Sequence, residues 1–137
     1  MYNATNKTWA SLPPLPVPVE QAQVATMSGM LYVAGGGSPN DSNVTSSVYM
    51  YDSFNNVWVS KAPMPMALKG AAVGVVYNKL YVAGGFGGPP SWPHLSSLYE
   101  YDPVTDTWAT KASMISDAIG NAAGAAVNSF LLPLIPI

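Results

Sequence analysis

The chain has 137 residues, 49% of them apolar, and this length and composition predict one folded unit with a single core. Five lysines, no arginine and seven acidic residues give a formal charge of −2, which excludes the basic footprint needed for nucleic acid or an anionic membrane. Because cysteine is absent, the chain has no disulfide, thiolate metal site or cysteine nucleophile, while the compartment stays open.

The N-terminal stretch MYNATNKTWA has neither the basic region nor the apolar run of a signal peptide. The C-terminal FLLPLIPI is apolar but too short to span a bilayer. Sequons that would accept glycans in a secreted chain begin at Asn3, Asn6, Asn40 and Asn43. Turn formation is the favoured interpretation of these residues, so the localisation is unknown.

Three similar segments organise the chain. YNATNKTW at residues 2–9, YDSFNNVW at 51–58 and YDPVTDTW at 101–108 each place a Tyr and a Trp seven residues apart. Without a gap, residues 2–36 and 51–85 share 14 identities in 35 positions, and both end in LYVAGG. Self-similarity at a fixed period of this size indicates a repeat architecture.

Each repeat is predicted to contain four strands. The run of small residues in GAAVGVVYN suits a crowded inner strand, and KLYVAGG follows it after a short turn. SSLYEYD is a third strand, and a tight hairpin leads from it into the fourth. With that turn centred between Phe54 and Asn55, Tyr51 lies opposite Trp58. The same arithmetic pairs Tyr101 with Trp108 and Tyr2 with Trp9. Four antiparallel strands in about 50 residues make one propeller blade.

At these residues the chain resembles the kelch repeats. The family's marks are a double glycine after the second strand, a hairpin like YEYDPVTDTW, and a Met-Pro segment, here APMPMA at 62–67. The resemblance implies that the glycines are structural, because paired blades leave no room for a Cβ. The double glycines are Gly35 with Gly36 and Gly84 with Gly85.

The third repeat departs from the pattern. GNAAGAAVNSF at 120–130 aligns with GAAVGVVYNKL at 70–80, but LLPLIPI then stands where YVAGG is expected. We therefore expect an all-β chain of about two and a half kelch blades that is not a closed ring by itself. The expected units are an outer strand at 1–19, blades at 20–61 and 62–111, and the inner strands of a third blade at 112–137.

Two explanations of this incomplete arc remain open. The favoured one is a fragment of a larger propeller. In the other, several chains assemble into one ring, with the N-terminal strand of one chain completing the C-terminal blade of its neighbour. Open blade edges favour self-association in either case.

Catalytic candidates are few. His94 is the single histidine and lies in a Pro-Gly loop, so an ordinary loop histidine is the favoured interpretation and no metal or cofactor is expected. Some proteins similar to kelch propellers are enzymes, a copper oxidase and a sialate epimerase. The sequence has neither the cysteine of the first nor an arginine to hold the carboxylate of the second, so we expect no enzyme.

Binding is the remaining function. The resemblance implies that the loops between second and third strands, and those between blades, share one face that receives a protein or peptide. Trp92 in its proline-rich loop is the best anchor, although it could instead cover its own blade. We therefore predict a protein-interaction module, with carbohydrate recognition as the alternative and a fragment of a kelch-type enzyme third. The candidate binding residues are Phe86, Trp92, His94, Asn40 and Asp41.

Overall fold

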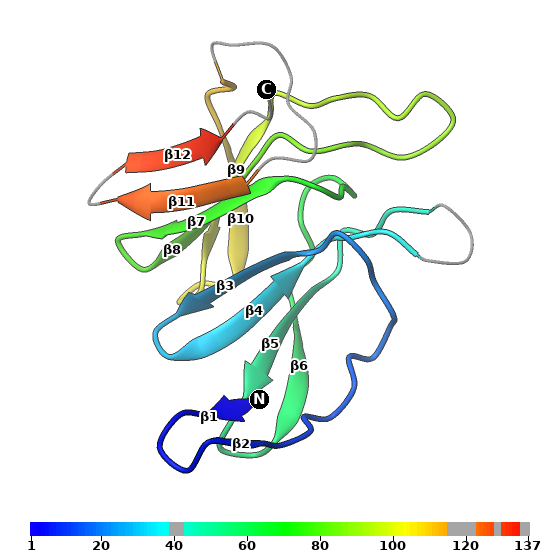
Figure 1. Ribbon diagram of the computed structural model, residues 1–137. Coiled ribbons are helices and arrows are strands. Elements are labelled where there is room, and N and C mark those ends of the chain that lie inside the picture. The colour runs from blue at the N-terminus through cyan, green and yellow to red at the C-terminus, as the bar shows by residue number, and fades with distance from the viewer. Residues whose placement is uncertain (39–42, 115–122, 128–129, 135–137) are drawn as a thin grey trace.

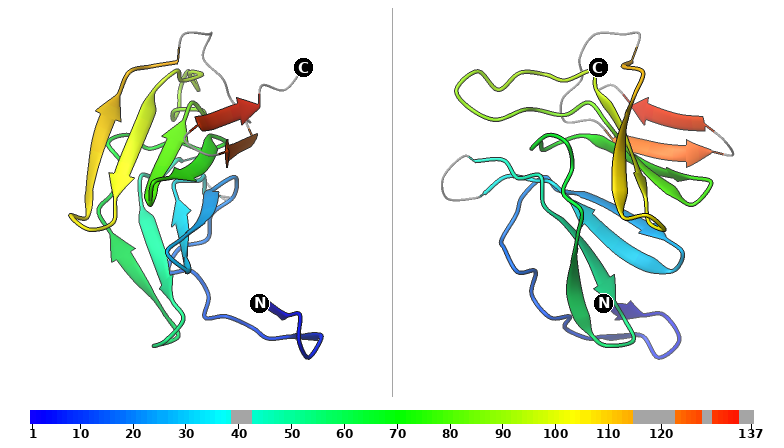
Figure 2. Two further views of the ribbon diagram at one scale, coloured as in Figure 1. Left: turned by 90° about the vertical axis from the view of Figure 1, so that its left-hand side faces the viewer. Right: turned by 180° about the vertical axis from the view of Figure 1, so that it is seen from behind.

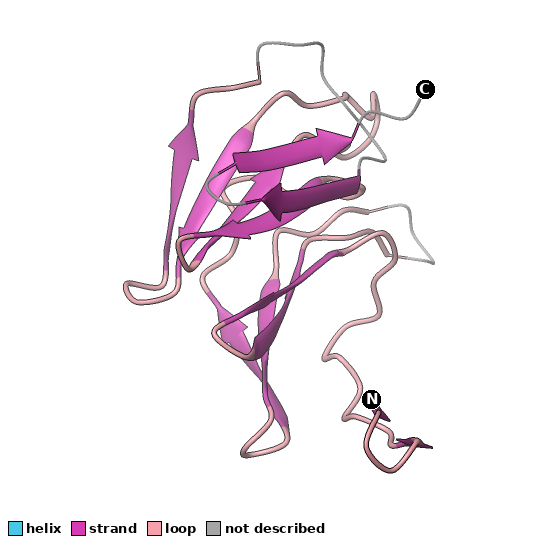
Figure 3. Cartoon of the chain, turned by 60° about the vertical axis from the view of Figure 1, so that its left-hand side comes forward, coloured by secondary structure: helices cyan, strands magenta, loops and turns pink. Residues whose placement is uncertain are grey.

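The computed structural model describes residues 1–38, 43–114, 123–127 and 130–134, and every regular element in these ranges is a β-strand. The strands form two four-stranded and two two-stranded antiparallel sheets. In the described residues these sheets make an open arc and not a closed ring (Figure 1). Loops and turns alone join them (Figure 3).

The first complete blade contains β3 (Gln23–Met27), β4 (Met30–Ala34), β5 (Val48–Asp52) and β6 (Val57–Lys61), hydrogen-bonded in that order. Every strand contains β-branched or aromatic residues, and the turns between the strands carry Asn, Gly and Ser. This sheet is the predicted kelch blade, which confirms the fold class.

The second complete blade repeats that order with β7 (Ala72–Val76), β8 (Lys79–Ala83), β9 (Leu98–Asp102) and β10 (Thr107–Lys111). Its β7–β8 turn has two residues, within the one or two that the sequence predicts. The inner strands β3 and β7 lie side by side, so the two blades pack face to face (Figure 1).

The two short sheets lie at opposite ends of the arc (Figure 2). At one end, β1 (Tyr2–Asn3) pairs with β2 (Thr8–Trp9), whereas the sequence led us to expect a single outer strand there. The Met1 carbonyl accepts a 2.8 Å hydrogen bond from the Ala10 N–H, which closes the hairpin. At the other end, β11 (Ala123–Val127) pairs with β12 (Phe130–Leu134).

The hairpin register agrees with the sequence prediction in all three repeats. Tyr51 lies opposite Trp58, and their ring centres are 5.3 Å apart. The equivalent rings are 5.1 Å apart both for Tyr101 with Trp108 and for Tyr2 with Trp9. The aromatic pair therefore closes each outer hairpin on one face of its sheet.

Small residues allow the inner strands to approach closely. A Cβ built on Gly74 of β7 would lie 3.3 Å from the Ala126 Cβ of β11 and 2.5 Å from the Leu131 side chain. A Cβ on Gly124 would lie 2.8 Å from the Ala72 Cβ. The alignment of residues 120–130 with 70–80 predicts that β11 begins 50 residues after β7. The structure places its start 51 residues after that of β7, so the third repeat is shifted by one residue.

Each double glycine lies where the chain leaves the second strand of a blade, and Gly35 and Gly85 both contact the connector between the two blades. Gly35 has φ +63°, and a Cβ there would lie 2.5 Å from the Leu68 carbonyl oxygen. Gly85 has φ +93°, and a Cβ there would lie 2.8 Å from the Lys69 carbonyl oxygen. Both the left-handed dihedral and the contact with the connector require glycine, which explains the repeated LYVAGG.

Candidate binding site on the loop face

The connector between β6 and β7, residues 62–71, lies between loops from two blades. On one side, the Leu68 carbonyl accepts a 2.9 Å hydrogen bond from the Gly36 N–H. On the other side, Lys69 and Phe86 exchange two backbone hydrogen bonds of 3.1 and 2.8 Å. The described parts of the β4–β5 loop, the connector and the β8–β9 loop therefore share one face, as the family resemblance implies. We call it the loop face.

Trp92, in the β8–β9 loop, is half-buried and has φ +47°. The Lys69 ammonium lies 4.9 Å from the centre of the Trp92 ring, a cation–π contact that links the loop to the connector. The same ammonium lies 3.6 Å from a carboxylate oxygen of Glu20, just before β3. Lys69 thus links the Trp92 ring to the connector and, through Glu20, to the segment before β3.

Phe86 and His94 face each other across the base of the same loop. Their ring centres are 4.6 Å apart, with planes at 88°, an edge-to-face geometry. The two residues also form an isolated antiparallel bridge. His94 therefore supports the position of the Phe86 ring.

A pocket of about 290 Å³ opens on the loop face between the two blades. Two aromatic rings give it apolar walls, while an amide and an ammonium provide hydrogen-bond donors. Such a mixture of apolar surface and a few polar groups is typical of binding sites. The pocket is lined by Gln21, Lys69, Phe86 and Trp92.

The structure brings together part of the predicted site. Phe86 and Trp92 line the pocket, whereas His94 lies against Phe86 and is not part of the lining. Asn40 and Asp41 lie outside the described residues.

Two lining residues were not predicted from the sequence. Lys69 lies in the connector between the blades, and the family resemblance places such connectors on the loop face. The sequence therefore contained a signal that could have identified Lys69. Gln21 precedes an inner strand of the other blade, and only the packing of the blades brings it to the pocket.

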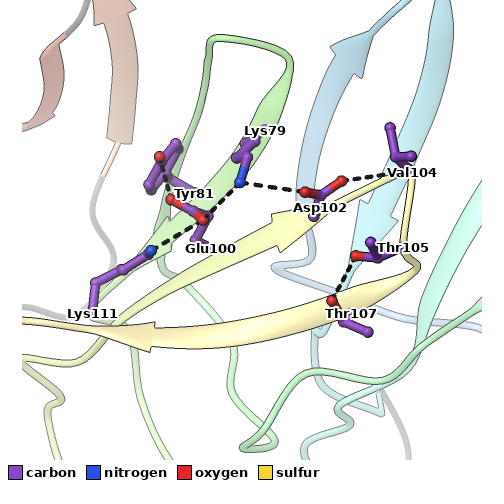
Figure 4. Close-up of polar contacts among 8 residues, drawn as sticks. All are labelled: Lys79, Tyr81, Glu100, Asp102, Val104, Thr105, Thr107 and Lys111. Carbon is purple, nitrogen blue, oxygen red and sulfur yellow. Dashed lines mark hydrogen bonds and ion pairs between the residues drawn. The ribbon is translucent and has the colours of Figure 1, made fainter.

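A second polar cluster lies on the sheet of blade 2 (Figure 4). The buried Glu100 carboxylate accepts hydrogen bonds from Lys79 at 3.2 Å and from the Tyr81 hydroxyl, and it pairs with Lys111 at 3.1 Å. The Tyr81 hydrogen bond, with help from the two lysines, holds the pKa of Glu100 below its usual value. Burial, together with this carboxylate, raises the pKa of Tyr81 to about 12.

In the part of the chain that the structure describes, no group of three His, Asp or Glu side chains could hold a metal ion. The same residues include no helix of the length and apolarity that a membrane span requires.

An open arc of four-stranded antiparallel blades, with a pocket formed by loops and a connector on one face, defines a β-propeller architecture. The family described as the Kelch motif matches residues 20–65 and 67–115, so the chain belongs to the kelch-repeat family. A search of curated proteins found no significant match.

Solved structures support the same assignment, with 156 matching chains. One is the structure of YjhT, with 25% sequence identity and a TM-score of 0.80. The match covers 91% of this chain and 46% of the YjhT chain. This chain therefore spans less than half the length of that relative.

Proposed function

We propose that the chain is a non-catalytic interaction module that binds a protein or peptide on the loop face. The observation that carries this proposal is the pocket between the blades, where Trp92 and Phe86 lie beside Lys69 and Gln21. Tryptophan is one of the residues that are enriched among interface hot spots. The loop of Trp92 is supported by the Lys69 contact and by the backbone bonds of the connector.

The chemistry of the pocket fits a peptide. The two aromatic walls would contact an apolar side chain, while the Lys69 ammonium, which has three N–H donors, can donate a hydrogen bond to a backbone carbonyl. Since the Lys69 charge is already balanced by Glu20, the site has no excess of positive charge to favour an acidic motif. We therefore expect a partner segment with an apolar or aromatic anchor and few charges.

The composition of the chain supports a non-catalytic role. The sequence contains no cysteine or arginine, and its single histidine, His94, lies edge-to-face against Phe86. The most buried acid of the described residues, Glu100, has its carboxylate engaged by Tyr81 and two lysines.

Carbohydrate recognition is the second candidate, because aromatic rings beside an amide are also suited to sugar binding. The stacking surface is limited, since Lys69 covers one face of Trp92 and His94 contacts Phe86. A glycan array would separate the candidates. A sugar signal that is lost when Trp92 is replaced would favour the carbohydrate role.

The test of peptide binding uses random peptides displayed on phage, selected on the immobilised chain. Selected peptides are then measured against a Trp92→Asn variant, because Asn tolerates the positive φ at this position. We expect their affinity to fall at least tenfold when the indole is removed.

Tyr77→Asn is the matched control. Tyr77 has φ +48° and is 80% exposed in the β7–β8 turn, at the opposite end of blade 2 from the β8–β9 loop. The selected peptides should bind this variant within twofold of the original chain. Equal binding by the two variants, or no enrichment of any peptide, would contradict the proposal.

A further inference from the structure

A second pocket opens on the loop face, in addition to the first pocket, which Phe86 and Trp92 line. Its volume is about 260 Å³. One wall is the segment before β3, at residues 17–19, and the other is the described part of the β4–β5 loop. None of the described lining residues is charged. The second pocket is lined by Val17, Pro18, Val19, Ser38, Asn43, Val44, Thr45 and Ser47.

The lining of the second pocket includes a connector position that stays exposed beside a complete blade. Val17, at this position before β3, is 38% exposed. Met66 occupies the same position of the repeat in the connector between the blades and is 44% exposed, although a complete blade lies on either side of that connector. The exposure of this position therefore belongs to the repeat itself.

Two contacts place the pockets side by side. The N–H of Leu68, the residue before Lys69 of the first pocket, donates a 3.3 Å hydrogen bond to the Thr45 carbonyl of the second pocket. A Cβ built on Gly88, in the β8–β9 loop, would lie 3.0 Å from a methyl carbon of Val44. The β4–β5 and β8–β9 loops extend to the same side of the molecule (Figure 1). The two pockets therefore share a wall.

Backbone contacts give the spacing of the pockets. The Gly36 N–H donates a 2.9 Å hydrogen bond to the Leu68 carbonyl, and Gly37 forms an isolated bridge to Val44. Two steps of about 4.8 Å thus separate Lys69 from Val44, so the pocket centres are about 10–15 Å apart once the side chains are included. An extended peptide covers this distance in about three to five residues.

We propose that one extended peptide occupies both pockets, with a large apolar or aromatic anchor in the first and an uncharged aliphatic anchor in the second. This inference rests on the proposed function, because it concerns the same partner. A charged anchor is disfavoured in the second pocket, since no charged lining residue offsets its desolvation. The peptide backbone crosses over Gly37 and Gly88, which have no side chains; a Cβ on Gly37 would lie 3.0 Å from the Lys69 Cδ.

The first experiment uses the unaltered chain and the peptides that the phage selection yields. Each peptide position is replaced by alanine, and fluorescence anisotropy measures the affinity. We expect two positions, about three to five residues apart, at which the affinity falls at least about fivefold, because truncation removes buried apolar surface. A single such position would overturn the inference and leave the proposed function standing.

The second experiment places a charge in the second pocket. Val17→Asp should weaken the selected peptides at least about fivefold, since their aliphatic anchor would then lie beside a carboxylate. Met66→Asp is the matched control, because it is equivalent in the repeat, similarly exposed and outside the lining of both pockets. This variant should bind within about twofold of the original chain. Urea unfolding checks that both variants are folded.

Comparison with Trp92→Asn separates the two proposals. Loss of binding with Trp92→Asn and Val17→Asp, but not with Met66→Asp, supports a peptide in both pockets. Loss with Trp92→Asn alone, or equal loss with the two aspartate variants, would overturn the inference and leave the proposed function standing. Binding unaffected by Trp92→Asn would contradict the proposed function, and this inference with it.

Discussion

Two physical effects require glycine at position 35, the left-handed backbone dihedral and the lack of space for a Cβ. A comparison with Gly29 separates the two effects. Gly35 and Gly29 both have positive φ, +63° and +76°. A Cβ on Gly29 would meet nothing within 4 Å, while one on Gly35 would lie 2.5 Å from the Leu68 carbonyl and 2.8 Å from the Met64 side chain. The dihedral is common to both sites, and the steric contact belongs only to Gly35.

We expect Gly29→Ala to lower the free energy of unfolding by about 1–2 kcal/mol, the cost of a left-handed non-glycine residue. Gly35→Ala should lower it by at least about 3 kcal/mol, because overpacking adds to that cost. Urea unfolding followed by tryptophan fluorescence measures both. Equal losses would show that the contact with the connector contributes nothing.

Asp106 gives the fold a dependence on pH. The hydrogen bond from Tyr101, together with that from the Ala62 N–H, holds the pKa of the Asp106 carboxyl below its usual value. A carboxyl with a depressed pKa in the folded state stabilises the fold above its unfolded pKa, near 4, and this contribution is lost as the pH falls through the folded pKa.

The substitution Asp106→Asn tests this effect. Blade 1 already has Asn56 at this position, and its amide oxygen accepts a 2.6 Å hydrogen bond from the Tyr51 hydroxyl. We expect the original chain to exceed the variant in unfolding free energy at pH 6, and the difference to shrink as the pH falls below 4. Denaturant unfolding over this pH range measures it, and a difference independent of pH would exclude the charge as its cause.

At the scale of the element, the sheets of the two blades differ at one pair of equivalent positions, which is apolar in blade 1 and charged in blade 2. Blade 1 has Met30 and Met50, which pack against the cluster that includes Tyr32 and Tyr101. Blade 2 has Lys79 and Glu100 at the same positions, 3.2 Å apart. Removing one partner of a buried ion pair is strongly destabilising, because the other charge stays buried without a partner. Replacing both partners by apolar residues of similar volume is often neutral or stabilising.

We expect Glu100→Met alone to destabilise the chain by about 2 kcal/mol, because Lys79, Lys111 and Tyr81 lose their acceptor. Adding Lys79→Met should recover at least about half of that loss, since it restores the pair found in blade 1. A double-mutant cycle of unfolding free energies measures the coupling. Additive losses would mean that the two side chains act independently.

At the scale of the whole molecule, the number of chains in the folded unit affects its thermal stability. If chains associate through the open strand edges of the arc, mass action makes the melting temperature rise with protein concentration. We expect an increase of several degrees between about 1 and 100 µM, measured by circular dichroism. A melting temperature independent of concentration would show that one chain is the folded unit.

Much of the fold could be predicted from local pattern. The spacing of Tyr51 and Trp58 predicted the hairpin register, because the pairing across a short turn depends only on residues near in sequence. The same arithmetic pairs Tyr2 with Trp9, although the division into units counted only an outer strand at 1–19, because only Met1 and Tyr2 precede that turn. It also placed the third repeat one residue out of step, because a run of Ala and Gly has too little pattern to fix a register.

The sequence by itself determined the blades, since their periodic glycines and aromatic pairs act within one repeat. It also determined that Phe86 and Trp92 belong to one loop, between the second and third strands of a blade. Only the tertiary structure decided what surrounds them. Lys69 lies over the Trp92 ring and Gln21 lines the same pocket because blade 1 packs against blade 2, and such contacts depend on the rotation between blades, which no local pattern encodes.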